Sequence, residues 1–146
     1  MRAKAAFVFG ALTLFAAPFA SAEEVDLSGN WSVATSLRPC TLTGKATLAP
    51  TADTSKSDYA CELTMRQSCP SGYEVVVRQS CRVRNVRGQV TIQSSIEEFV
   101  QGPFSPSYAP DNFRLTVQSD QELYGAQIDR YGTLSATWTR ATGSIS

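Results

Sequence analysis

The chain has 146 residues, with 13 basic residues, 13 acidic residues and no histidine. This balanced charge gives no electrostatic reason to expect nucleic acid as a partner. Without histidine the sequence cannot build His-based acid–base catalysis, Ser-His-Asp or Cys-His nucleophiles, or a histidine-ligated zinc site. We therefore expect a protein that is not an enzyme, with no catalytic residue, no metal ligand and no cofactor.

The first segment, residues 1–22, has the three parts of a secretory signal peptide. Residues 1–4 are short and basic, residues 5–19 are mostly apolar, and Ala20, Ser21 and Ala22 form an A-x-A cleavage site. The apolar run is too short for a membrane-spanning helix, which needs about 20 residues. The sequence predicts cleavage near Ala22, a periplasmic or secreted location and no membrane span. It leaves one domain, residues 23–146, with 11 basic and 13 acidic residues.

Alternation of apolar and polar residues with period two dominates the remaining chain, and this pattern is typical of half-buried strands. In the last such segment, Leu134, Ala136 and Trp138 alternate with threonine and serine. The predicted strands, in chain order, are residues 29–35, 41–49, 59–67, 73–86, 89–96, 112–118, 121–128 and 133–140, of which 121–128 has the weakest pattern. Residues 95–100 could form one helical turn, and no longer helix is indicated.

Eight short strands with one apolar face fit either a closed barrel or a sandwich. The connections are short, small residues such as Gly44 and Gly125 alternate with large ones, and closure removes exposed sheet edges. The sequence therefore predicts an all-β fold, an eight-stranded antiparallel up-and-down barrel with two disulfides.

The four cysteines, Cys40, Cys61, Cys69 and Cys81, all follow the predicted signal. An even number of cysteines in an exported domain indicates disulfides, and the absence of any C-x-x-C pair argues against zinc. Three pairings are possible. We expect sequential pairing, Cys40–Cys61 and Cys69–Cys81, because it would join neighbouring hairpins.

Residues 97–112 form the longest segment without regular alternation, and they contain three prolines and three aromatic residues. Long loops are uncommon unless they are functional or disordered. Phe99, Phe104 and Tyr108 are therefore the candidate binding residues, since aromatic side chains supply contact area for a partner. The alternative is that Phe99 and Phe104 fold back over the open end of the barrel as a lid.

Residues 26–31 (Asp-Leu-Ser-Gly-Asn-Trp) resemble the D-L-x-G-x-W opening of lipocalin-like barrels in the calycin group. The resemblance implies that Trp31 plugs one barrel end and that a basic residue of the last strand packs across it. Arg140 has the parity to point inward and would form this cation–π contact.

Within that group the chain is most similar to the small periplasmic inhibitors of bacterial metalloproteases, which share this opening and an early disulfide. Their cysteines are about as far apart as Cys40 and Cys61. The resemblance implies a non-catalytic binding protein whose partner is another protein, with a protease as one candidate. A carrier of a small apolar ligand, of lipocalin or avidin type, and an envelope accessory protein are the alternatives. The oligomeric state stays open.

Overall fold

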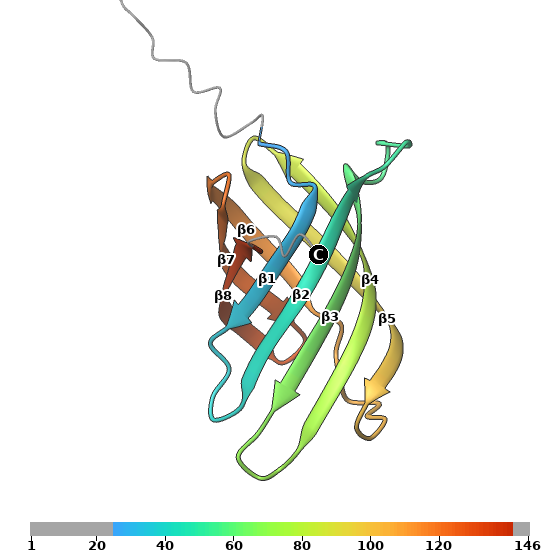
Figure 1. The fold of residues 1–146 in the computed structure, drawn as a ribbon, viewed down its shortest axis with the longest axis vertical. Coiled ribbons are helices and arrows are strands. Elements are labelled where there is room, and N and C mark those ends of the chain that lie inside the picture. The colour runs from blue at the N-terminus through green and yellow to red at the C-terminus, as the bar shows by residue number, and fades with distance from the viewer. Residues whose placement is uncertain (1–24, 142–146) are drawn as a thin grey trace, which may run out of the picture.

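The computed structural model describes residues 25–141 and contains eight strands, and the predicted signal, residues 1–22, lies outside the described residues. In chain order the strands are β1 (Gly29–Thr35), β2 (Thr41–Pro50), β3 (Tyr59–Ser68), β4 (Glu74–Val86), β5 (Gln89–Gln101), β6 (Asn112–Ser119), β7 (Glu122–Asp129) and β8 (Gly132–Arg140). Each strand pairs antiparallel with the next, and β8 returns to pair with β1 (Figure 1). The predicted closed up-and-down barrel is confirmed, and the sandwich is excluded.

A continuous apolar core fills much of the interior of the barrel. Trp31, Phe113 and Trp138 are fully buried in one continuous apolar core, and the Phe113 and Trp138 rings meet edge to face with centroids 5.2 Å apart. Gly44 and Gly125 allow a close approach of neighbouring strands, because a Cβ at either position would overlap the backbone of the adjacent strand.

The segment predicted to be irregular begins later than expected. Residues 97–101 continue β5 and pair with β4, so the loop covers only residues 102–111, and residues 95–100 form no helical turn. Two register shifts insert Glu97 and Val100 as extra residues into β5. Each β-bulge reverses the inward and outward parity of the residues beyond it. The broken alternation in the sequence therefore reflects bulges within a strand.

The disulfides connect Cys40 with Cys69 and Cys61 with Cys81, so the expected sequential pairing is wrong. Strand register explains this result. Cys61 lies opposite Leu48, whereas Cys40 precedes the other end of β2. Those two cysteines are separated by roughly 26 Å of strand, and a disulfide spans at most about 7 Å between Cα atoms. Cys61 and Cys81 are direct cross-strand neighbours, 4.6 Å apart at Cα, and both are buried.

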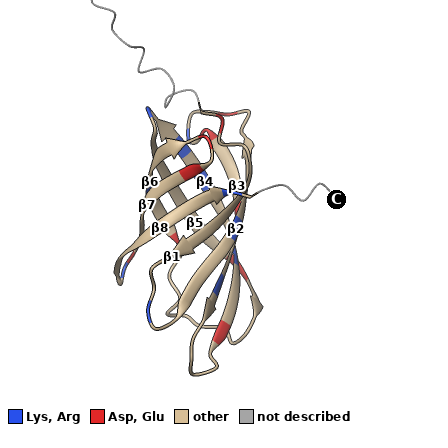
Figure 2. Cartoon of the chain, turned by 60° about the vertical axis from the view of Figure 1, so that its left-hand side comes forward, with Lys and Arg blue, Asp and Glu red and all other residues tan. Residues whose placement is uncertain are grey.

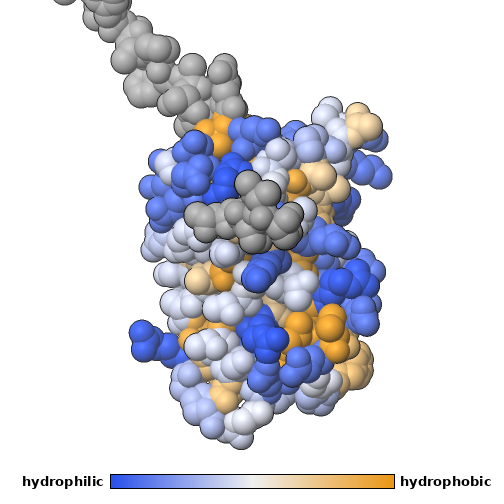
Figure 3. Space-filling model, viewed as in Figure 1, coloured by the Kyte–Doolittle hydropathy of each residue, from blue (hydrophilic) through white to orange (hydrophobic). Residues whose placement is uncertain are grey.

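Charged residues are distributed over several strands and connections of the barrel (Figure 2). Three arginines of the β3–β4 region have acidic partners, in the ion pairs Arg66–Glu74, Arg78–Glu62, Arg78–Glu98 and Arg84–Asp58. Figure 3 shows a mainly hydrophilic to neutral face with a hydrophobic patch over the lower part of β4 and β5. None of the residues from 25 to 141 forms a helix with the length and hydropathy that a membrane crossing needs.

Candidate functional site: a cavity at the open end of the barrel

One end of the barrel is closed by Trp31, Arg140 and Leu27. The Arg140 guanidinium lies 4.3 Å from the centre of the Trp31 ring and donates hydrogen bonds to the carbonyl oxygens of Asp26, Ser28 and Asp120. The Trp31 indole donates to the carbonyl oxygen of Leu27 at 2.9 Å. These contacts close the end at which the described chain begins, where Leu27 and Trp31 are fully buried.

The other end is open and contains a cavity of about 750 Å³. Four connections surround it, namely β1–β2, β3–β4, β5–β6 and β7–β8, which lie together at the lower end in Figure 1. The described lining has an aliphatic part, a group of three tyrosines, two carboxylates and neutral polar groups. It consists of Leu37, Leu42, Gln67, Tyr73, Ser105, Ser107, Tyr108, Ala109, Asp111, Asp129, Tyr131, Gly132, Thr133 and Leu134. Small-molecule sites in proteins commonly have this size and mixed character.

A buried polar network centred on Asp111 lies between this cavity and the apolar core. The Asp111 carboxylate accepts hydrogen bonds from the amide of Gln79 at 2.6 Å, the hydroxyl of Tyr108 at 2.8 Å and the amide of Gln127 at 2.9 Å. The backbone N–H of Asp111 donates to the side-chain oxygen of Gln79 at 2.9 Å. Asp111, Gln79 and Gln127 are all almost fully buried. The network joins β4, the β5–β6 loop and β7.

Burial dominates the electrostatics of this network. It raises the pKa of the Asp111 carboxyl above its usual value, because the charged form loses solvation, and the three hydrogen bonds oppose this rise only in part. Asp129 adds a second negative charge that raises the same pKa further. Burial also raises the pKa of the Tyr108 phenol, so this hydroxyl remains a donor to Asp111. The site therefore concentrates acidic groups in a poorly solvated place.

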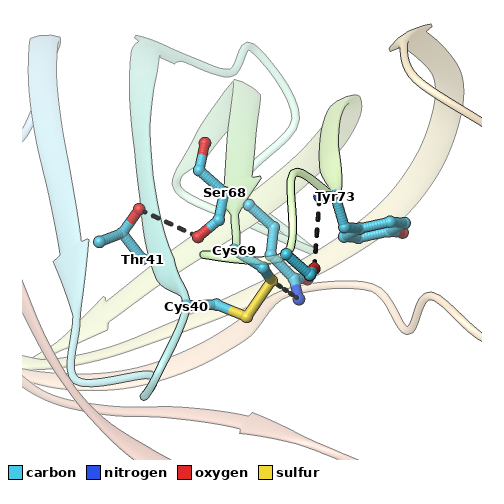
Figure 4. The surroundings of a disulfide bond; sticks show 7 residues. Cys40, Thr41, Ser68, Cys69 and Tyr73 are labelled. Carbon is cyan, nitrogen blue, oxygen red and sulfur yellow. Dashed lines mark hydrogen bonds between the residues drawn. A yellow bond between two sulfur atoms is a disulfide. The ribbon is translucent and has the colours of Figure 1, made fainter.

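Cross-links hold the rim of the cavity in place. The Cys40–Cys69 disulfide joins the β1–β2 and β3–β4 connections, beside the Thr41–Ser68 hydrogen bond at the base of β2 and β3 (Figure 4). On the β5–β6 side, the Tyr131 hydroxyl donates to the carbonyl oxygen of Ser107 at 2.6 Å, and Arg130 donates to the same oxygen at 3.0 Å. A rim fixed in this way loses less conformational entropy when a ligand binds.

The three aromatic residues expected to bind a partner lie together but have different environments. Phe99 packs edge to face against Phe104 and Tyr108, with ring centroids 5.0 and 6.1 Å away. Tyr108 lines the cavity, whereas Phe99 and Phe104 are not part of its described lining. Phe104 is 73% exposed, so it does not fold back as a lid.

The polar residues at the centre of the site were missed by the sequence reasoning. Gln79 and Gln127 occupy inward positions on β4 and β7, and Asp111 precedes β6. The available signal was polar residues at positions that alternation assigns to the interior, since buried polar side chains need a specific partner. Along residues 25–141, no three or more His, Cys, Asp and Glu side chains come together as a potential metal site.

Comparison with known proteins supports the fold and gives no family. No protein-family model matches the sequence, and no curated protein matches it significantly. A redesigned β-barrel, b11L5F_LGL, has 16% sequence identity and a TM-score of 0.51 over 78% of this chain and 90% of its own. The redesigned barrel mFAP0 bound to DFHBI has 16% identity and a TM-score of 0.50, over 78% of this chain and 98% of its own. EF1p2_mFAP2b bound to DFHBI has 15% identity and the same TM-score, 0.50, over 78% and 93% of the two chains. At these identities the likeness concerns the fold alone.

Proposed function

We propose that the protein is an exported, non-catalytic binding protein that holds a small molecule in the open end of its barrel. The observation that carries this proposal is the cavity of about 750 Å³ with its cross-linked rim. The opposite end is filled by the Trp31–Arg140 stack, so a ligand would enter only from the open end. Two solved structures of similar fold, mFAP0 and EF1p2_mFAP2b, are bound to the small molecule DFHBI, which is consistent with this use of the architecture.

Export and a lipocalin-like ancestry belong to the same proposal. All four cysteines are joined in disulfides, as suits a protein that matures outside the reducing cytosol. The D-L-x-G-x-W opening leads directly to a Trp31 stacked under Arg140, as the resemblance to lipocalin-like barrels implies.

A pair of neighbouring substitutions tests the binding site. Leu134 lines the cavity, whereas Ser135 points outward from the same strand. Leu134→Trp should fill the cavity and abolish binding of small molecules found by NMR screening or by native mass spectrometry of protein from the periplasm. Ser135→Trp should leave binding unchanged. The proposal fails if no small molecule binds, or if binding survives Leu134→Trp in a folded protein.

A protein partner is the second candidate, and the exposed aromatic loop favours it. Phe104, whose ring packs against Phe99, is 73% exposed, and Val100, next to Phe99 in β5, is 54% exposed. Large exposed apolar side chains commonly mark contact surfaces. The similarity of the opening residues to periplasmic metalloprotease inhibitors makes a secreted protease the partner to test. The early bridge of those inhibitors has no equivalent here, since Cys40 pairs with Cys69.

Protease assays separate the two candidates. If the loop binds a protease, the mature protein should inhibit at least one secreted metalloprotease, and Phe104→Ser should weaken inhibition by about tenfold or more, as loss of an aromatic anchor does. Tyr124→Ser is the control, because Tyr124 is an exposed aromatic residue on β7. Absence of inhibition at micromolar excess across several enzymes would remove this candidate.

A further inference from the structure

The chemistry of the open-end cavity points to the class of ligand, on the basis of the small-molecule binding proposed above. We propose that the cavity selects an organic cation, with an ammonium group placed at Asp129 and Asp111 and an apolar body packed on the aliphatic part of the lining. Three features of the described lining support this assignment, namely its charge, the balance of its hydrogen-bond donors and acceptors, and its aromatic rings.

The charged side chains in the described lining of the cavity are all acidic. Two carboxylates, Asp111 and Asp129, belong to its described lining, and no lysine or arginine does. Neither carboxylate takes part in the four ion pairs found among residues 25–141. The two carboxylates are also close together, because the Gln127 amide nitrogen lies 2.9 Å from an oxygen of Asp111 and 3.3 Å from an oxygen of Asp129. An anionic ligand would meet repulsion here, whereas a cation would meet two carboxyl groups that no basic side chain of the described lining neutralises.

The hydrogen-bonding groups are unbalanced in the same direction. The amide hydrogens of Gln79 and Gln127 and the Tyr108 hydroxyl already donate to Asp111. The side-chain oxygen of Gln127 is buried and accepts no hydrogen bond from the residues that the structure describes. Buried polar atoms normally have a partner. The network thus has acceptors in excess of donors, and an ammonium group brings only donors.

Three tyrosines, Tyr73, Tyr108 and Tyr131, complete the lining. Tyrosine rings attract cations through the negative face of their π-system, and cages of such rings recognise ammonium ligands. One of these rings already has a cation nearby, since the Arg130 guanidinium lies 5.1 Å from the centre of the Tyr131 ring. Arg130 is exposed, is not part of the described lining and is engaged with the carbonyl oxygens of Pro106 and Ser107.

The accessible carboxylate is Asp129, which lies half-buried at the end of β7. Its side chain accepts the backbone N–H of Tyr131 at 2.7 Å and the amide of Gln127 at 3.3 Å, so its position is fixed before a ligand arrives. Asp111 lies deeper and supplies a second charge. Leu37, Leu42, Ala109 and Leu134 form the aliphatic part of the same cavity. An alkyl or aryl amine has the matching combination of one charged end and an apolar body.

Binding should also depend on pH in a defined direction. Asp111 faces Gln79 on β4, Tyr108 in the β5–β6 loop, and Gln127 and Asp129 on β7, and none of these is basic. Because its pKa is raised, the Asp111 carboxyl keeps its proton up to a higher pH than an ordinary aspartate does. An alkylammonium ion remains charged up to about pH 10. Affinity for the cation should therefore rise as the pH rises through the pKa of Asp111.

Three probes of equal chain length test the proposal, namely octylammonium, octanol and octanoate, titrated into the mature protein below their micellar concentrations. NMR shifts of residues such as Leu42 and Leu134 report binding in the cavity, and calorimetry gives the affinity. We expect octylammonium to bind about tenfold or more tighter than octanol, since hydrogen bonds to charged groups are worth that much, and octanoate to bind most weakly.

Two aspartate variants complete the test. Asp129→Asn keeps an acceptor for the Tyr131 N–H and should lose most of the preference for octylammonium over octanol, while binding of octanol stays unchanged. Asp120→Asn, at the plugged end, should change neither. If octanol or octanoate binds in the cavity as tightly as octylammonium, the cation proposal is overturned and small-molecule binding stands. If none of the three shifts the cavity signals, both fail.

Discussion

Asp111 makes the stability of the protein depend on pH in the opposite sense to an ordinary paired carboxylate. Its folded-state pKa is raised, so the folded protein holds the proton more tightly than the unfolded chain, whose aspartates titrate near about pH 3.9. The stabilising contribution of the protonated form is present below that pH and is lost as the pH rises through the folded pKa.

We therefore expect Asp111→Asn to become progressively more stable relative to the wild type as the pH is raised above about 4 and through the raised pKa of Asp111. Urea unfolding of both proteins at several pH values measures this difference. The exposed Asp120→Asn variant serves as the control, because Asp120 lies in the β6–β7 turn at the plugged end of the barrel, far from the network. A difference between Asp111→Asn and the wild type that stays constant over this range would contradict the expectation.

Arg140 gives a second prediction for a single residue. Its guanidinium stacks on Trp31 and donates to three backbone carbonyl oxygens, so Arg140→Met should lower the free energy of unfolding by about 2 kcal/mol. Arg82→Met, on the exposed face of β4, is the matched control and should change stability by less than about 0.5 kcal/mol. Chemical denaturation followed by tryptophan fluorescence measures both. Equal effects at the two positions would show that the stack contributes nothing specific.

Individual residues also show where reasoning from sequence reached its limit. Alternation placed Trp31, Trp138 and Leu134 on the inner face, because a period of two along one strand is enough to identify its inward residues. Gln79 and Gln127 share that parity. Their partner, Asp111, lies 32 positions from Gln79 and 16 positions from Gln127. Alternation along one strand cannot reveal a partner on another part of the chain.

At the scale of elements, the eight strands were predictable because each has its own turn signals and its own alternation. β5 was the exception, since its bulges at Glu97 and Val100 shift the parity and imitate a loop. The disulfide pairing failed for a related reason. It depends on register between strands, and cysteines that are neighbours in sequence lie at opposite ends of β2 and β3.

The transition from β5 to its loop depends on Gly102. This residue has a φ of +85°, and a Cβ added there would overlap the carbonyl oxygen of Glu74. Gly72 has a similar φ of +91° with open space around it, so it is the matched control. Gly72→Ala should cost about 1 kcal/mol for the backbone conformation alone, whereas Gly102→Ala should cost about 3 kcal/mol because β4 and β5 must also move apart.

Thermal unfolding of the two alanine variants measures this comparison. Hydrogen exchange should also show faster exchange at residues 98–101 in Gly102→Ala and no such change in Gly72→Ala. If both variants lose the same stability, the close approach of Gly102 to Glu74 has no energetic weight.

At the scale of the whole molecule, the two disulfides stabilise different parts of the barrel. They close loops with sequence separations of 29 and 20 residues, for which the chain-entropy model gives about 3–4 kcal/mol each. Cys61–Cys81 lies within the core, and Cys40–Cys69 lies at the rim of the cavity.

Replacing Cys40 and Cys69 together by serine should lower stability by about this amount and should also weaken ligand binding, because the β1–β2 and β3–β4 connections are no longer joined. Replacing Cys61 and Cys81 together by alanine should lower stability at least as much and leave affinity unchanged in the folded fraction. Calorimetry on the two double variants distinguishes the effects. Equal affinity in both would show that the rim bridge is not needed for binding.

The seam between β1 and β8 has a consequence for chain connectivity. Residue 141 donates its backbone N–H to the carbonyl oxygen of Asn30, so the beginning and end of the described barrel lie side by side. Among the eight described strands, every other pair joins neighbours in sequence, so β1–β8 is the one strand pair whose formation must wait for the end of the barrel sequence. The eight strands form a closed ring, and the order of the chain only determines between which two strands the termini lie. A circular permutant with new termini within the exposed residues 52–56 should therefore fold into the same barrel.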